Sequence, residues 1–196
     1  MSDAEEAAIT FVRAWGEAVL RTVERVADVR RRAAALNREL DRVWDRDGEA
    51  TLTVIWRENW TEEHTLIWAL HQLERWVARL AVERGEEAPQ ENVTLRNVRN
   101  ALEHLDEAEL PDDATAAVAG DNDRRNRSLR TLPGGQLYIA TGGRIFGAFD
   151  LRDLAAIAQA QVDRVDLEAT ARHEASVDAA ADSYADKVID ERRDTP

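Results

Sequence analysis

The feature that most constrains the fold is an uninterrupted apolar repeat near the start of the chain. Residues 4–46 contain no proline and a single glycine, Gly16. Apolar residues recur at alternating steps of three and four from Val12 to Val43, with Thr22 as the one polar member. Such a seam is typical of a helix that packs lengthwise on another helix. The partner is either a helix of the same chain or a second copy, and the pattern leaves both open.

Two further amphipathic helices are predicted before residue 110. Gly48 is expected to end the first helix. Residues 50–57 have the composition of a strand but also fit the first turns of the next helix. That helix is expected to begin at Thr61, where acidic residues favour a helix start, and to end at Gly85. A third helix is predicted over residues 91–108, with leucine and valine along one face.

The second half of the chain is predicted to be mixed. Residues 109–135 are polar and indicate a loop, whereas residues 137–149 indicate a β-hairpin that turns at Gly142-Gly143. A packing helix is expected to begin at Asp150. We therefore expect a mainly α protein with a small β-hairpin insertion. Its parts are a helical bundle (1–110), a loop, hairpin and packing helix (111–170), and an acidic tail that is helical or disordered (171–196).

The charge composition narrows the possible partners. The net charge of −13 argues against a large non-specific nucleic-acid surface, because phosphate contacts need lysine and arginine. Residues 121–152 reverse this balance, with six arginines against three aspartates. Within this stretch, Arg124, Arg125 and Arg127 are candidate contacts to an RNA backbone, and a solvated loop is the alternative interpretation.

Cysteine usage and hydropathy limit the chemistry and the location. The chain has no cysteine, which excludes disulfides, a thiol nucleophile and a cysteine-ligated metal. No apolar run reaches the length of a membrane span, and the acidic start lacks the basic and then apolar order of a signal peptide. We therefore expect a cytoplasmic protein that uses no cofactor.

One short motif at residues 99–104, Arg-Asn-Ala-Leu-Glu-His, carries most of the functional information. On a helical wheel it places four polar side chains opposite the apolar stripe of the third predicted helix. These are Arg99, Asn100, Glu103 and His104, and two pairs among them are four residues apart. The helix is thus expected to present a guanidinium, an amide, a carboxylate and an imidazole away from its own core.

These side chains suit the cleavage of RNA without a metal. A ribose 2′-hydroxyl must lose a proton to attack phosphorus, and the leaving 5′-oxygen must gain one. Histidine titrates near neutral pH and can move both protons. Arginine offers a planar set of donors that matches phosphate, and asparagine can orient the imidazole or the phosphate.

The motif resembles that of the HEPN domain family, in which arginine, a polar residue, three further residues and histidine lie late in a bundle helix. Arg99-Asn100-x-x-x-His104 fits this pattern without a gap. The resemblance covers residues 1–110 at most. It implies a helical homodimer with two facing motifs and a metal-independent ribonuclease, often of toxin–antitoxin or phage-defence systems. Arg99 and His104 would then be catalytic, and Asn100 supporting. Glu103, on the same helix face, completes the set of candidate catalytic residues.

Other interpretations of the same residues lead to different functions. On an exposed face, Arg99 and Glu103 simply form an ion pair, and His104 is then a surface histidine at a helix end. The chain would in that case be a non-catalytic helical homodimer acting as an interaction or regulatory module, or an acidic partner of a basic protein. His64 and His71 are expected at a helix surface, or alternatively form a second wall of the same cleft.

Overall fold

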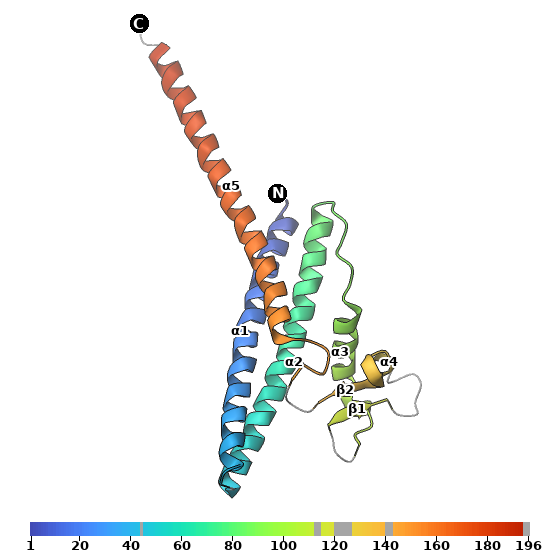
Figure 1. Cartoon of the computed structure of the whole chain (residues 1–196). Helices are drawn as coiled ribbons and strands as arrows, with labels where there is room; N and C mark the ends of the chain where they lie inside the picture. Colours follow the sequence, from blue (N-terminus) through green and yellow to red (C-terminus); the bar gives the residue numbers. More distant parts are fainter. Residues whose placement is uncertain (44, 112–114, 120–126, 140–142, 194–196) are drawn as a thin grey trace.

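The computed structural model describes residues 1–43, 45–111, 115–119, 127–139 and 143–193, with side chains as far as residue 180. The chain is a mainly α protein, as predicted (Figure 1). Its elements in chain order are α1 (Asp3–Leu40), α2 (Arg46–Glu83), α3 (Val93–Glu103), the 3₁₀ turn η1 (Leu105–Glu107), β1 (Ala116–Val118), α4 (Arg127–Arg130), the 3₁₀ turn η2 (Pro133–Gly135), β2 (Gln136–Tyr138) and α5 (Leu151–Arg193).

The helices α1 and α2 form a long hairpin at the centre of the fold (Figure 1). The apolar seam of α1 is buried within the chain from Val12 to Val29, except for Trp15, which is partly buried. Its polar member, Thr22, is also buried, and its hydroxyl donates to the Ala18 carbonyl at 2.7 Å. This part of the seam therefore packs on other helices of the same chain. Val43, its last member, lies beyond the end of α1 and is 70% exposed.

The start of α2 corrects the predicted boundary between the first two helices. The Asp45 carboxylate accepts hydrogen bonds from the backbone N–H groups of Asp47 and Gly48, at 3.3 and 3.1 Å. This N-cap starts α2 at Arg46. Gly48 therefore lies in the first turn of α2 and does not end α1. Residues 50–57 lie in α2, which confirms the alternative that they belong to the first turns of this helix, and the predicted start at Thr61 is wrong.

The helix α3 is shorter than predicted at its C-terminal end. It begins after Asn92, whose side chain accepts from the backbone N–H of Leu95 at 3.0 Å. It ends at Glu103, and His104 has a non-helical backbone with φ −117° and ψ 26°. The 3₁₀ turn η1 follows at once. The predicted continuation to residue 108 is therefore wrong, and His104 is the C-cap and not a helical residue.

The small sheet pairs β1 with β2 in antiparallel register, with Ala117 opposite Leu137. The predicted hairpin across Gly142-Gly143 is wrong, because the partner of β2 precedes it in the chain. Residues 140–142 lie outside the described part. Residues 143–149 form a tight turn in which Phe146 and Gly147 have φ of 48° and 71°. The ring of Tyr138 packs directly on Gly147, so a Cβ at that position would collide with it.

The helix α5 packs on α1 with its first half and extends past the N-terminal end of α1 with its second half (Figure 1). Leu154, Ala158, Val162 and Val165 are buried. The contact is close, because a Cβ on Gly16 would lie 2.5 Å from Cγ2 of Val162. The predicted tail is helical as far as Arg193, and its side chains at residues 171–180 are exposed.

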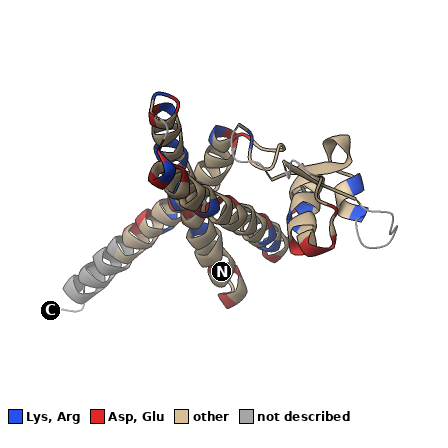
Figure 2. Cartoon of the chain, turned by 90° about the horizontal axis from the view of Figure 1, so that it is seen from below, with Lys and Arg blue, Asp and Glu red and all other residues tan. Residues whose placement is uncertain are grey.

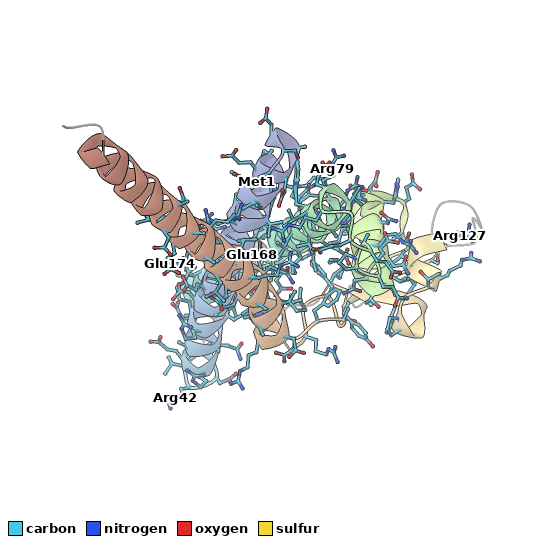
Figure 3. All side chains as sticks on the ribbon, turned by 90° about the horizontal axis from the view of Figure 1, so that it is seen from above. Met1, Arg42, Arg79, Arg127, Glu168 and Glu174 are labelled. Atoms are coloured by element: carbon cyan, nitrogen blue, oxygen red, sulfur yellow. The ribbon has the colours of Figure 1, made fainter. Side chains whose placement is uncertain are left out.

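One arginine ties three helices together at the N-terminal end of α1. Arg84 Nε donates to Glu5 at 3.1 Å, and its two terminal nitrogens donate to Glu168 at 3.1 and 2.5 Å. The hydrogen bond from Arg84 is the main cause that lowers the pKa of Glu168. Glu168 lies on α5 at the point where that helix crosses the hairpin (Figure 3). The packed half of α5 is therefore held by an ionic contact as well as by its apolar residues.

Candidate functional site

Arg99 lies between α3 and α2. Its guanidinium stacks over the ring of Trp68 on α2, with Cζ 5.6 Å from the ring centroid, a cation–π arrangement. On its own helix, Arg99 Nε donates to Glu103 Oε1 at 3.2 Å, and Nη2 donates to both carboxylate oxygens. The side chain is 25% exposed. Arg99 thus lies against α2 and does not project away from the core as the helical wheel predicted.

The other two motif residues, Asn100 and His104, differ in their exposure to solvent. Asn100 is half-buried on α3. His104, at the C-cap, has a side chain that is 58% exposed, and its Nδ1 lies 3.9 Å from a carboxylate oxygen of Glu107. The structure therefore brings Arg99 and Glu103 into direct contact. His104 follows them beyond the helix end and faces solvent within the single chain.

Two histidines of α2, His64 and His71, lie beside tryptophans of the same helix. His71 is 7% exposed, and its Nδ1 is buried with no hydrogen-bond partner among the described residues. His64 is half-buried, and its ring meets the ring of Trp60 edge-on at 5.3 Å between centroids. Trp68 lies between them along the helix and is 42% exposed. Neither His64 nor His71 is therefore a fully exposed surface histidine.

The pKa of both α2 histidines lies below the ordinary value. Burial is the main cause for each of them. The positive charges of Arg99 and Arg75 lower the pKa of His71 further, whereas the carboxylates of Glu103 and Glu91 oppose that shift. For His64, the opposing group is Glu103 alone. The Glu103 carboxylate therefore acts on both imidazoles as well as on Arg99.

The burial of His71 predicts that the free energy of unfolding depends on pH. Because the folded-state pKa of His71 is below its usual 6.5, the unfolded chain takes up the proton first as the pH falls. The free energy of unfolding should therefore decrease as the pH falls through about 6.5 and be flat above it. Urea titrations between about pH 7.5 and 5.5 measure this slope. His71→Gln should reduce it, and the exposed His173→Gln should not; equal slopes in all three proteins would contradict the assignment.

The predicted RNA-contacting arginines are only partly within the described residues. Arg124 and Arg125 lie outside them. Arg127 begins α4 and is exposed, on the side of the molecule opposite Glu174 of α5 (Figure 3). The short helix α4 packs near α3. Along the long helices, basic and acidic positions are interspersed (Figure 2).

A buried ion pair between α1 and α2 was not foreseen from the sequence. Arg30 donates to Glu63 Oε1 through Nε and Nη2 at 3.1 and 2.7 Å, and to the Gly143 carbonyl at 2.7 Å. The Asn59 amide donates to the same Glu63 oxygen at 2.6 Å. The exposed fractions of Glu63 and Asn59 are 3% and 1%. The pair borders a hollow of about 340 Å³ that Trp56 also lines. A heptad pattern records only the apolar positions, so it gave no sign of this contact.

Within the described residues, no group of three or more histidines and carboxylates is placed to hold a metal ion. None of the described helices combines the length and the hydropathy that a membrane crossing requires. Comparison of the chain with protein-family models, with curated proteins and with solved structures found no match. The fold and the site therefore define a mainly α protein whose candidate site is the face shared by α2 and the C-terminal end of α3.

Proposed function

We propose that the chain is a metal-independent endoribonuclease of HEPN type, acting as a homodimer with its site on the α2–α3 face. The observation that carries this proposal is the Arg-Asn-x-x-x-His motif. Its arginine stacks on the partly exposed ring of Trp68 from α2, and its histidine is the C-cap of α3. Arg99 would bind the phosphate, and His104 would move protons. Asn100 and Glu103 would orient these two groups.

The arrangement of Arg99 supports a role in binding phosphate. Its planar guanidinium lies on Trp68, and hydrogen bonds to Glu103 fix its orientation. A guanidinium held in this way loses little side-chain freedom when a phosphate binds. As the 2′-oxygen bonds to phosphorus, negative charge grows on the phosphoryl oxygens, and preorganised donors stabilise it.

The exposure of His104 supports a role in proton transfer. A general acid or base must reach the substrate, and the imidazole of His104 is more than half exposed at the end of α3. In the reaction, the 2′-oxygen forms a bond to phosphorus and the bond to the 5′-oxygen breaks. The 2′-hydroxyl loses one proton and the 5′-oxygen gains one. The products are a 2′,3′-cyclic phosphate and a 5′-hydroxyl.

A second copy of the chain would complete the cleft. In a single chain, Trp68 and His104 are exposed, and the motif lies on an open face. A homodimer with two facing motifs would enclose the RNA between them. A protein antitoxin or regulator would cover the same face, which fits a toxin or phage-defence role in the cytoplasm.

The test is cleavage of RNA in the presence of EDTA. We expect the purified full chain to cut a labelled RNA and to leave 2′,3′-cyclic phosphate and 5′-hydroxyl ends. His104→Ala should lose this activity, and a DNA of the same sequence should stay intact because it lacks the attacking hydroxyl. Cleavage by His104→Ala at the wild-type rate, or products with 3′-hydroxyl ends, would show that the motif is not the site.

A second candidate is a non-catalytic helical homodimer that acts as an interaction or regulatory module. The ion pair between Arg99 and Glu103 favours it, because the guanidinium already has a carboxylate partner. This alternative predicts a dimer in analytical ultracentrifugation and no RNA cleavage at any enzyme concentration. Cleavage that disappears in Arg99→Ala would exclude it.

A further inference from the structure

We propose that the chain binds a small molecule in an apolar pocket between α2, α5 and the start of α3, and that the ligand is an uncharged ring compound with one hydrogen-bond donor. The pocket has a volume of about 180 Å³. None of the described residues that line it belongs to the Arg-Asn-x-x-x-His motif. This inference is therefore independent of the ribonuclease function, and each of the two can fail without the other.

Apolar side chains of α2 and α5 form the main walls of the pocket. On α2, Leu70, Leu73 and Val77 follow one another at steps of three and four residues, which places them on one side of the helix. On α5, Leu154 and Ile157 line the opposite wall. The three α2 side chains and Leu154 are buried, whereas Ile157 is 50% exposed. Ile157 therefore lies at the mouth of the pocket, and the other four side chains form its interior.

The remaining walls come from the segments next to these helices. The ring of Phe149, just before α5, is partly buried against the core. Pro89 and Asn92, between α2 and α3, and Leu95 of α3 close the other side. The backbone N–H of Asn92 donates to Glu74 Oε1 on α2 at 2.6 Å, which holds this segment in place. A ligand would therefore enter a pocket whose walls are already ordered, and little conformational entropy is lost on binding.

The size and the lining of the pocket select the kind of ligand. Apolar cavities of about 150 Å³ in other proteins bind benzene, so this pocket has room for one small ring system. It has no room for a helix of another protein. Transfer of the ring from water to apolar walls is the main driving force for such binding.

One polar atom in the wall of the pocket lacks a partner. The Gln161 side chain lines the pocket one helical turn after Ile157. Its Oε1 is buried and has no hydrogen-bond partner among the described residues. A buried acceptor without a donor costs free energy, which a donor from the ligand would offset. The terminal torsion of glutamine is broad, so this oxygen can turn toward an N–H or O–H group in the pocket.

The charge of the pocket excludes anionic ligands. The Glu74 carboxylate belongs to the wall, and no lysine or arginine is among the described lining residues. An anion in the pocket would lose its hydration and meet a like charge without a counter-charge. An uncharged ring with a single N–H or O–H, as in indoles and phenols, matches the volume, the apolar walls and the acceptor.

The first experiment locates the bound ligand. The full chain with labelled methyl groups is titrated with indole and followed by methyl NMR. We expect indole to shift the signals of Leu73, Leu95 and Leu154, which line the pocket. The signal of Leu52, a buried residue near the remote start of α2, should stay in place. No shift at any indole concentration, or equal shifts throughout the chain, would overturn the proposal.

Two variants block the mouth of the pocket or leave it open. Ile157→Trp places a large ring at the mouth and should abolish the shifts of the pocket signals. Leu167→Trp is the matched control, because Leu167 is on the same helix and 71% exposed, and does not line the pocket. It should bind indole as the wild type does. Undiminished binding by Ile157→Trp would show that indole binds elsewhere, and the proposed site would be wrong.

The second experiment tests the hydrogen bond. Indene is the analogue of indole in which carbon replaces the N–H group. Gln161→Met keeps the length of the side chain and removes the acceptor, so the ratio of the indene Kd to the indole Kd should fall about 5-fold. Gln159→Met, at an exposed glutamine of the same helix, should leave the ratio unchanged. An equal ratio in the wild type and in Gln161→Met would overturn the ligand class proposed here. These titrations contain no RNA, so their outcome does not depend on the ribonuclease function.

Discussion

Replacing Glu63 by alanine is expected to lower the free energy of unfolding by about 3 kcal/mol. The substitution removes the acceptor of three hydrogen bonds, two from Arg30 and one from Asn59. It leaves a guanidinium that is 22% exposed without its counter-charge, and a buried amide without an acceptor. Leaving one buried charge without its partner costs much more free energy than the intact pair contributes to stability. The expected loss of stability is therefore large. Urea denaturation of the full chain measures it.

Two further variants separate burial from charge. Glu58→Ala is the matched control, because Glu58 also pairs α2 with α1, through Arg32, but both side chains are about 45% exposed. It should change stability by less than about 1 kcal/mol. Removing both buried partners, in Arg30→Met/Glu63→Met, should restore part of the loss, since no lone charge remains. A Glu63→Ala protein as stable as Glu58→Ala would mean that the pair is not buried in solution.

The seam of α1 could be predicted because its information is local. A repeat of three and four residues identifies a helix wherever its partner lies. The same repeat does not indicate whether the partner helix belongs to the same chain or to a second copy. In the structure, Gly16, next to the seam residue Trp15, meets Val162 of α5, nearly 150 residues later in the chain. That contact depends on the path of the whole chain, so it could not be inferred from the repeat.

The start of α2 was missed because local composition and tertiary packing disagree there. Residues 51–56 contain β-branched and aromatic residues, which favour strands. In the structure, Leu52 and Ile55, three residues apart, are buried together on one side of the helix. The Asp45 cap was present in the sequence and, given more weight than the β-type composition, would have placed the start correctly.

The strand pairing of the sheet could not be predicted from the sequence. The turn signal Gly142-Gly143 suggested a strand partner after β2, whereas the observed partner β1 lies in a stretch that reads as polar loop. Pairing between strands some 20 residues apart leaves no local pattern. A small antiparallel sheet was expected and β2 lies in the predicted segment, but its partner was predicted after it in the chain, whereas β1 precedes it.

Only the contacts within α3 could be predicted from the sequence of the candidate site, and the contacts between helices could not. The spacing of Arg99 and Glu103 by four residues gave their ion pair directly. The contact of Arg99 with Trp68 depends on how α3 is rotated against α2, which the sequence of neither helix records. The early end of α3 was also missed, because the first proline after it, Pro111, lies well beyond His104.

Replacing Arg99 by alanine is expected to reduce RNA cleavage by about 100- to 1000-fold in kcat/KM, the usual effect of removing one donor that stabilises a developing oxyanion. Arg99→Lys should recover only part of this loss. Lysine keeps the positive charge but lacks the planar donors and the stacking on Trp68. The rate of cleavage of a labelled RNA in EDTA, measured at limiting substrate, gives both values.

The fold should survive this substitution, which makes the result interpretable. The contacts that Arg99 loses are a partly exposed ion pair with Glu103 and one cation–π contact, together worth about 1 kcal/mol. Arg96→Ala is the matched control: Arg96 is on the same helix, pairs with Glu91 and is 42% exposed. It should cleave at the wild-type rate. If Arg99→Ala and Arg96→Ala cleave equally well, the phosphate is not bound by Arg99, and the α2–α3 face is better explained as the interface of a non-catalytic dimer.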